Sequence, residues 1–315
     1  MRSSIIISFC FANPFLTLAY DTPFAFKARP TIENRTIDDI YQAALAEGGV
    51  VTAWHGGDEK NQQDALKKAF EERFPGMTLN ITVDVSKYHN GLIDEQLANG
   101  NLYVDSAILQ TLHDYPRWKE AGALLHYAPL DFDKIHTSFR DIHAAYYGVN
   151  IFGWNIDFAD FLDPNLRDRI VLTYPNDDDA VLYTFDLIMQ QLGAGWFDDL
   201  LLQNPRWVRG SATPTSLIDQ ANNKGAAIFK DAPHPESTKL LHNFLISKEY
   251  LETTPRWTVR TDAPAHFPKI FDELYTNVNV FADWMADRER VERLRFWFEK
   301  QIGTPQGLSP LEDDL

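Results

Sequence analysis

The first half of the chain alternates between short apolar runs and longer amphipathic runs. The run at 77–85 places apolar residues at every second position, as a half-buried strand does, whereas the run at 58–74 repeats them at helical spacing. The predicted order is a strand at 50–54, a helix at 58–74, a strand at 77–85, a helix at 89–100 and a strand at 104–111. Strands that alternate with helices in this way predict a parallel sheet with crossover helices.

The pattern changes after about residue 127. A crossing segment leads into an aromatic, strand-like stretch, and the periodic segments then lie farther apart. The predicted elements are strands at 144–157, 170–173 and 226–229, helices at 176–193 and 282–303, and a helix that starts near 235. A further helix at 36–49 precedes the first strand and ends at two glycines. A chain of 315 residues with this change of pattern predicts two lobes.

Polar residues gather where the predicted strands end. In a parallel sheet, ligands bind beyond the carboxyl ends of the strands. His55 and the Gly56–Gly57 turn follow the first strand, and Gln110 lies at the end of the third. The candidate cleft residues are Trp54, His55, Gly56, Gly57, Tyr88, Gln110, Asn176, Asp177, Ser211 and Thr213. Each of them can also be an ordinary loop residue, and two glycines alone fall short of a phosphate-loop pattern.

Two other runs resemble ligand sites but have simpler interpretations. Asn176 to Asp179 opens a predicted helix, so we interpret these acids as an N-cap with first-turn carboxylates. A calcium loop would need regularly spaced oxygen ligands, which are absent here. Tyr146 and Tyr147 are neighbours on a strand-like segment, so their side chains point to opposite faces, and we expect both to pack in the core.

The charge balance and the absence of catalytic motifs weigh against some classes of partner and of enzyme. The chain has 29 lysines and arginines against 45 acids, a formal net charge of -16. This balance argues against nucleic acid or an anionic membrane as partner, because both reward basic patches. The sequence contains no Gly-x-Ser-x-Gly elbow, no His-Glu-x-x-His and no glycine-rich dinucleotide turn, so no enzyme class is favoured.

The N-terminus has the features of a secretion signal. Residues 1–19 combine Arg2, an apolar stretch and small residues that end at Ala19, and 20–37 read as an irregular leader. Cleavage after Ala19 removes Cys10, the only cysteine, which leaves no disulfide and no thiol nucleophile. Asn-x-Thr triplets at Asn34 and Asn80 fit a secreted glycoprotein. No later segment predicts membrane insertion.

Several segments, taken in order, resemble one known family. They include EGGVVTAWHGG, LKKAFEERFPGM, DFLDPNLRDRIVLTYPNDDDAVLY, AAIFKDAPHPESTKLLHNFLISKE and VERLRFWFEKQIG. Together they are similar to extracellular solute-binding proteins of ABC-type importers, in the iron(III)-type branch that secreted fungal proteins also carry. The resemblance implies a type II periplasmic-binding-protein-like fold: α/β, with mixed sheets flanked by helices in two lobes and a cleft between them.

The resemblance also implies where the lobes and the ligand lie. Lobe 1 would comprise 38–127 and about 226–258, and lobe 2 would comprise 128–225 and about 259–315. Iron-binding relatives often place a histidine ligand just after the first strand, which makes His55 a candidate metal ligand here. Their adjacent tyrosine pair has no counterpart, because the segment at 216–229 contains no tyrosine. The second lobe therefore looks shortened.

The sequence supports one leading hypothesis and leaves two others open. The leading one is a secreted, monomeric, non-catalytic protein that holds a small molecule or ion between its lobes, with a metal ion or a small anion as candidate ligands. One alternative is a secreted enzyme on the same scaffold. The other is a degenerate family member without a working cleft.

Overall fold

A five-stranded sheet forms the larger part of the molecule. The computed structural model describes residues 29–57, 59–150, 158–210, 224–253, 258–267 and 280–307. The strand order is β3(Thr78–Asp84), β2(Val50–Gly56), β4(Ser106–Leu109), β9(Lys224–Ile228) and β6(Tyr147–Asn150). β3 and β4 run parallel to β2, whereas β9 is antiparallel to both β4 and β6. The predicted parallel β-α-β order is thus confirmed for the first three strands, and the sheet as a whole is mixed.

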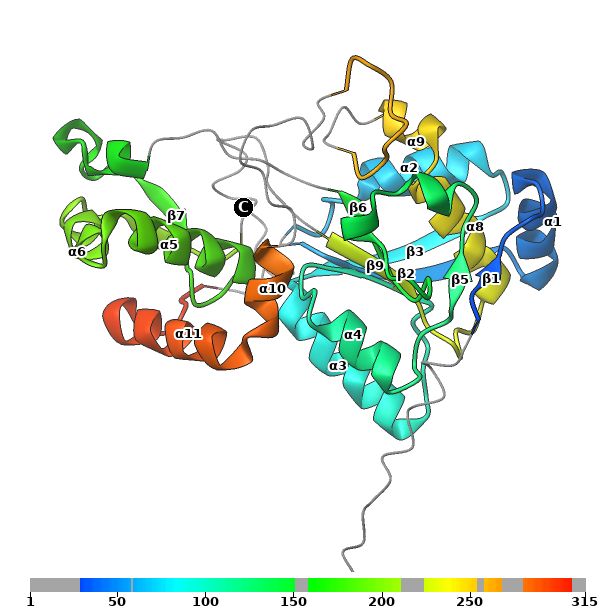
Figure 1. Cartoon of the computed structure of the whole chain (residues 1–315), viewed down its shortest axis with the longest axis horizontal. Coiled ribbons are helices and arrows are strands. Elements are labelled where there is room, and N and C mark those ends of the chain that lie inside the picture. The colour runs from blue at the N-terminus through cyan, green and yellow to red at the C-terminus, as the bar shows by residue number, and fades with distance from the viewer. Residues whose placement is uncertain are drawn as a thin grey trace, which may run out of the picture.

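Helices cover both faces of this sheet, as Figure 1 shows. One face packs against α1(Ile37–Glu47), α2(Asp64–Arg73) and α8(Pro235–Leu245), and the other against α3(Ser86–Asn99) and α4(Asp114–Glu120). Successive side chains of β2 point to opposite faces of the sheet. Ala53 packs in the core with α1, α2 and α8, and Trp54 packs in the core with α3 and α4. A strand covered on both sides has a nearly continuous apolar sequence, and 50–54 fits this, with Thr52 as its one polar residue.

Short elements complete the first unit. They are the two-stranded pair β1(Thr31–Ile32) and β5(Tyr127–Ala128), the helix α9(Lys248–Thr253), and the 3-10 turns η2(Phe132–Lys134) and η3(Thr137–Phe139). We call the described residues within 29–150 and 224–267 the first unit. β1 lies within 20–37, so part of the expected irregular leader is paired strand. Residues 1–19, the predicted signal, lie outside the described residues.

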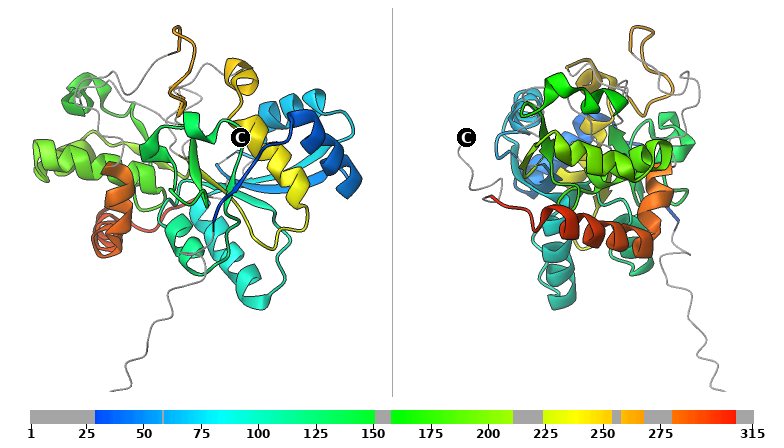
Figure 2. Two further views of the ribbon diagram at one scale, coloured as in Figure 1. Left: turned by 45° about the vertical axis from the view of Figure 1, so that its right-hand side comes forward. Right: turned by 90° about the vertical axis from the view of Figure 1, so that its left-hand side faces the viewer.

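A second unit is built around its own aromatic core. It comprises the described residues within 158–210 and 280–307. Its elements are η4(Phe158–Leu162), η5(Pro164–Leu166), β7(Val171–Thr173), α5(Asp179–Leu192), α6(Gly195–Leu202), β8(Arg206–Val208), α10(Val280–Ala286) and α11(Arg288–Ile302). Phe185, Phe197 and Phe298 pack together between α5, α6 and α11. In Figure 1, α5, α6 and α11 lie to one side of the large sheet, and α10 lies between them and α3. The left view of Figure 2 shows the same separation of α5 and α6 from the sheet.

The C-terminal helix differs from its prediction. The sequence pattern predicts one helix over 282–303, but the structure has α10 and α11 with a break at Asp287. The Asp287 side chain accepts a hydrogen bond from the Arg290 amide at 3.1 Å, so it caps a new helix. Asp186 holds both sides of the break, since it accepts from Trp284 Nε1 at 2.6 Å and pairs with Arg290 at 2.7 Å.

The boundary between units also differs from the expected one. The sequence analysis assigns 128–150 and the segment after 259 to the second lobe, whereas the structure places 128–150 and 258–267 with the large sheet. Ile135, Tyr147 and Val259 share one core cluster, and β6 pairs with β9. Sequence spacing carries no record of that pairing, because β6 and β9 are far apart along the chain. Among the described residues, no helix is long and apolar enough to cross a bilayer.

Candidate functional site

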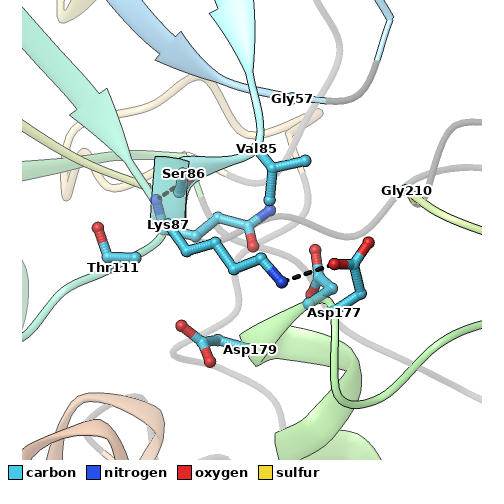
Figure 3. A pocket seen from close by; sticks show the side chains of 10 residues that line it. Gly57, Val85, Ser86, Lys87, Thr111, Asp177, Asp179 and Gly210 are labelled. Atoms are coloured by element: carbon cyan, nitrogen blue, oxygen red, sulfur yellow. Dashed lines mark hydrogen bonds and ion pairs between the residues drawn. The ribbon is translucent and has the colours of Figure 1, made fainter. Parts of the chain in front are cut away.

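A small cavity lies where the two units meet. Its walls come from the carboxyl ends of β2, β3 and β4, the start of α3 and the start of α5 (Figure 3). The lining residues are Gly57, Val85, Ser86, Lys87, Gln110, Thr111, Asp177, Asp178, Asp179 and Gly210. The space open to water is about 20 Å³, which holds about one water molecule. The cleft is therefore nearly closed in this structure.

The wall on the first unit is tied together at the strand ends. Ser86 Oγ accepts a hydrogen bond from the Gln110 amide at 3.0 Å, which links the start of α3 to the end of β4. Gly56 permits this approach, because a Cβ on Gly56 would lie 2.0 Å from Ser86 Oγ. The Gly57 amide donates to the Asp84 carbonyl at 2.9 Å and so continues the pairing of β2 with β3. The glycine pair thus serves close packing.

The wall on the second unit is the acidic turn before α5. Asp178 is the N-cap, and its carboxylate accepts from the amides of Ala180 at 2.8 Å and Val181 at 2.9 Å. Asp179, in the first turn, forms an ion pair with Arg295 of α11. The interpretation of this run as a cap with first-turn acids is confirmed for Asp178 and Asp179, whereas Asn176 and Asp177 lie before the cap. Asn176 donates from Nδ2 to the Gly303 carbonyl at 3.1 Å, which fixes the turn to the C-terminal segment.

Asp177 takes no part in the cap and faces the first unit instead. Its Oδ1 lies 2.6 Å from Lys87 Nζ of α3, and its Oδ2 accepts from Arg209 Nε at 3.0 Å. Figure 3 shows the Lys87 ammonium reaching across the cavity to this carboxylate. Arg209 also donates to the Tyr88 hydroxyl, so two consecutive residues of α3 bind two residues of the second unit. Asp177 is only 3% exposed.

Burial and charge shape the titration of this cluster. Burial raises the pKa of the Tyr88 hydroxyl, and the nearby Asp177 carboxylate acts in the same direction. Burial opposes the charge of Arg209, but the hydrogen bond to Asp177, the attraction of its charge and the contact with Tyr88 together outweigh burial and raise the pKa of the guanidinium. Burial likewise raises the pKa of Asp84, which lies at the end of β3. Lys87 and Arg209 are thus cations held close together around one carboxylate.

His55 lies behind the wall and not in the cavity. The residue is 4% exposed, and its Nδ1 lies 2.9 Å from the Gly56 carbonyl oxygen. The buried Lys224 ammonium donates to that carbonyl at 2.5 Å and lies 3.4 Å from Nδ1. A metal ion bound there would meet this ammonium as a like charge. No group of three or more histidine, cysteine, aspartate or glutamate side chains suited to a metal occurs among the residues that the structure describes.

The predicted cleft residues that the structure describes divide into three groups. Gly57, Gln110 and Asp177 line the cavity. Gly56, Tyr88 and Asn176 adjoin it through the contacts given above. Trp54 and His55 do not line it, and Trp54 instead stacks on His89 in the core at a ring distance of 4.8 Å. Ser211 and Thr213 lie outside the described residues.

Neither cation of the site, Lys87 or Arg209, is among the residues that the sequence pattern predicts for the cleft. Lys87 directly precedes Tyr88 in the sequence, and Arg209 precedes Gly210 and the predicted Ser211. Their position next to predicted cleft residues could have indicated that they lie in the cleft. Only the fold shows that both contact the Asp177 carboxylate. Thr111, 1% exposed, also lines the cavity, and its hydroxyl has no hydrogen-bond partner among the described residues.

A second polar cluster has the composition of a catalytic pair but is inaccessible. Ser106 Oγ lies 2.7 Å from His242 Nε2, and the Tyr147 hydroxyl lies 2.6 Å from His242 Nδ1. Ser106 and His242 are both 0% exposed, so no substrate reaches the hydroxyl. Tyr146 packs separately against Tyr115. The expectation that Tyr146 and Tyr147 belong to the core is confirmed.

Comparisons with known proteins identify the fold. No family model and no curated protein matches the chain. Iron-bound HitA from Pseudomonas aeruginosa matches at 15% identity and a TM-score of 0.56, over 79% of this chain and 99% of that one. Apo ferric ion-binding protein A from Pasteurella haemolytica matches at 13% identity and 0.57, over 80% and 98%.

A third solved structure has a different kind of bound molecule. AfuA from Actinobacillus pleuropneumoniae, with exogenous fructose-6-phosphate bound, matches at 16% identity and a TM-score of 0.58, over 80% of this chain and 98% of that one. At these identities the likeness concerns the fold. The chain has the two-lobed α/β architecture of periplasmic binding proteins, as the sequence resemblance implied.

Proposed function

We propose that this protein is a non-catalytic solute-binding protein that holds a small anion in the cleft between its two units. The observation that carries the proposal is the pair of cations, Lys87 and Arg209, which converge on one carboxylate inside the cleft. The cleft lies beyond the carboxyl ends of β2, β3 and β4, where open α/β sheets bind ligands. A carboxylate or phosphate group is the chemistry that such a cation pair favours.

A metal ion is the second candidate, and the described residues favour it less. Of the three structures named above, two are described as iron-bound or as ferric ion-binding, whereas AfuA is described with a sugar phosphate. The one predicted metal ligand, His55, is buried beside the Lys224 ammonium. The carboxylates around the cavity are already engaged by cations or by helix amides. An anion therefore suits the site better than a cation.

Thermal denaturation in the presence of candidate ligands tests the proposal. Inorganic phosphate, citrate, a sugar phosphate and ferric iron are compared on one preparation. A ligand present at 100 times its Kd adds about 2.7 kcal/mol to the free energy of unfolding. We expect an anion to stabilise the protein and Lys87→Met to abolish the effect.

Two matched variants make the result specific. Lys68→Met removes a lysine that is 74% exposed on α2 and should leave the anion effect intact. His55→Gln should also leave it intact, since His55 does not line the cavity. Stabilisation by ferric iron that His55→Gln abolishes, without any effect of anions, would contradict the proposal and favour the metal site.

The proposal includes secretion of a monomer with a shortened second lobe. Secretion is supported by the signal-like sequence at 1–19 and by two Asn-x-Thr triplets whose asparagines, Asn34 and Asn80, are exposed. Expression in a eukaryotic secretory host followed by enzymatic deglycosylation tests both asparagines. A mobility shift that Asn80→Gln reduces is expected, whereas retention of the protein inside the cell would count against secretion.

A further inference from the structure

We infer that Asp177 acts as an internal ligand: its carboxylate occupies the anion position of the cleft and holds the two units together until a solute displaces it. The inference rests on the proposed function for the identity of the competing solute. The closure itself is a property of the ligand-free protein. The two parts can therefore be tested separately.

The contacts of Asp177 span the boundary between the units. Lys87 belongs to α3 of the first unit, whereas Asp177 and Arg209 belong to the second unit. Opening the cleft would break the Lys87–Asp177 ion pair and the hydrogen bond from Arg209 to the Tyr88 hydroxyl. It would leave the Asp177–Arg209 pair intact, because both residues move together. One carboxylate therefore joins the units and also orients the arginine that makes the second contact.

The position of Asp177 cannot be explained by the local structure of α5. Asp178 satisfies the first amides of the helix, and Asp179 pairs with Arg295 within the second unit. Asp177 lies just before them, 3% exposed, with both carboxylate oxygens on cations. A carboxylate held by an ammonium and a guanidinium has the chemistry of a bound anionic solute. The remaining space of about 20 Å³ leaves no room for a second anion beside it.

Displacement of Asp177 would lower the apparent affinity for solute. Suppose that a ligand binds only the form in which Asp177 is released. Its apparent Kd then equals its intrinsic Kd divided by the fraction of the protein in that form. Removing the charge of Asp177 should therefore have two effects. The ligand-free protein should open, and anions should bind more tightly.

The opening is measured as a distance between the units in the ligand-free full chain. Cys10, the only cysteine, is replaced by serine, and spin labels are placed through Lys68→Cys on α2 and Leu202→Cys on α6, at side chains 74% and 70% exposed. Pulsed electron spin resonance then compares Asp177→Asn with the parent. We expect a longer and broader distance distribution in Asp177→Asn. An unchanged distribution would overturn the inference.

Control variants separate closure from general destabilisation. Asp186→Asn removes a buried, ion-paired aspartate on α5 whose hydrogen bond to Trp284 and ion pair with Arg290 both lie within the second unit. We expect it to keep the parent distance even if its melting temperature falls. Lys87→Met cuts the same bridge from the other side and should open the protein like Asp177→Asn. If Lys87→Met leaves the distance unchanged, Asp177 does not hold the units through this contact.

Binding of inorganic phosphate, measured by calorimetry, tests the competition. We expect Asp177→Asn to bind phosphate roughly tenfold more tightly than the parent, the effect of losing one charge-assisted hydrogen bond. Lys87→Met should instead weaken binding, so the two variants that open the protein change affinity in opposite directions. Opening without phosphate binding in any variant would support the internal closure and count against phosphate as solute. Equal affinity of Asp177→Asn and the parent would overturn the competition.

Discussion

Two turns face each other across the cavity, and they contribute to it in opposite ways. The turn after β2 presents backbone at Gly57, while the side chains before it, Trp54 and His55, are buried behind the wall. The turn before α5 presents carboxylates, of which Asp177 crosses to the first unit. The sequence analysis placed both turns at the cleft and expected side chains from both.

The difference follows from what each turn is attached to. β2 is an interior strand of a sheet that helices cover on both faces, so its side chains from Val51 to His55 are buried. The turn before α5 precedes a helix, whose first amides need acceptors, and polar side chains collect there for that reason. A strand end within a covered sheet therefore offers backbone to a ligand, and a helix start offers charged side chains.

The largest expected effect is the loss of stability at low pH. All nine histidines lie outside the described residues of the second unit, so histidine protonation should act on the first unit. Burial lowers the pKa of His89, which stacks on Trp54 beneath the first turn, from 6.5 to about 4. Burial lowers that of His242 to about 3. The unfolded chain then binds protons more readily than the folded one. Stability is full above pH 6.5 and falls as pH decreases toward 4, by roughly 3 kcal/mol at pH 4 for His89 alone.

Urea denaturation between pH 7 and pH 4, combined with hydrogen exchange, measures this effect. His89→Phe should reduce the loss, whereas His266→Phe, at an exposed position, should not. Amides of the first unit should lose protection first. Earlier loss of protection in α5 and α11 would contradict the predicted difference between the units.

The second test concerns the backbone role of the first turn. A Cβ at Gly56 would lie 2.0 Å from Ser86 Oγ and 3.6 Å from Leu109 Cα, and it would push Ser86 away from the Gln110 amide. We expect Gly56→Ala to lower the free energy of unfolding by about 2 kcal/mol. The control is Gly91→Ala in α3, where a Cβ meets nothing within 4 Å. Gly91→Ala should stabilise the helix by up to about 1 kcal/mol. Equal stabilities of the two variants would show that Gly56 is not needed for packing.

The smallest expected effect concerns the cap of the second turn. Asp178→Ala removes the acceptor of two α5 amides and should cost about 1 kcal/mol of unfolding free energy. Asp199→Ala, an exposed position inside α6, should change stability much less. Asp199→Ala should leave phosphate affinity unchanged, and Asp178→Ala should not weaken it, because the cap supplies no cation and Asp178 adds a negative charge to the cavity wall. A loss of affinity in Asp178→Ala alone would mean that the cap itself contacts the solute.

The strongly periodic parts of the fold were predictable, and the long-range pairings were not. The alternation at 77–85 corresponds to β3, and the helical stripe at 58–74 to α2, although α2 begins only at Asp64. α4 and α6 were not predicted, because they have only 7 and 8 residues and so offer few periods to recognise. The break at Asp287 was missed because its cause, Asp186, lies on another helix.

The sequence by itself determined that strands and helices alternate, that the cleft forms at strand ends and helix starts, and that a helix follows the acidic run, with Asp178 as its cap and Asp179 in its first turn. These follow from local periodicity and capping, which act between residues close along the chain. Only the tertiary structure decided that His55 is turned toward Lys224, and that Lys87, Asp177 and Arg209 meet. Those contacts join segments about 30 to 170 residues apart. A charge that is removed from water by burial needs a partner, and the spacing of residues along the sequence does not encode which partner it meets.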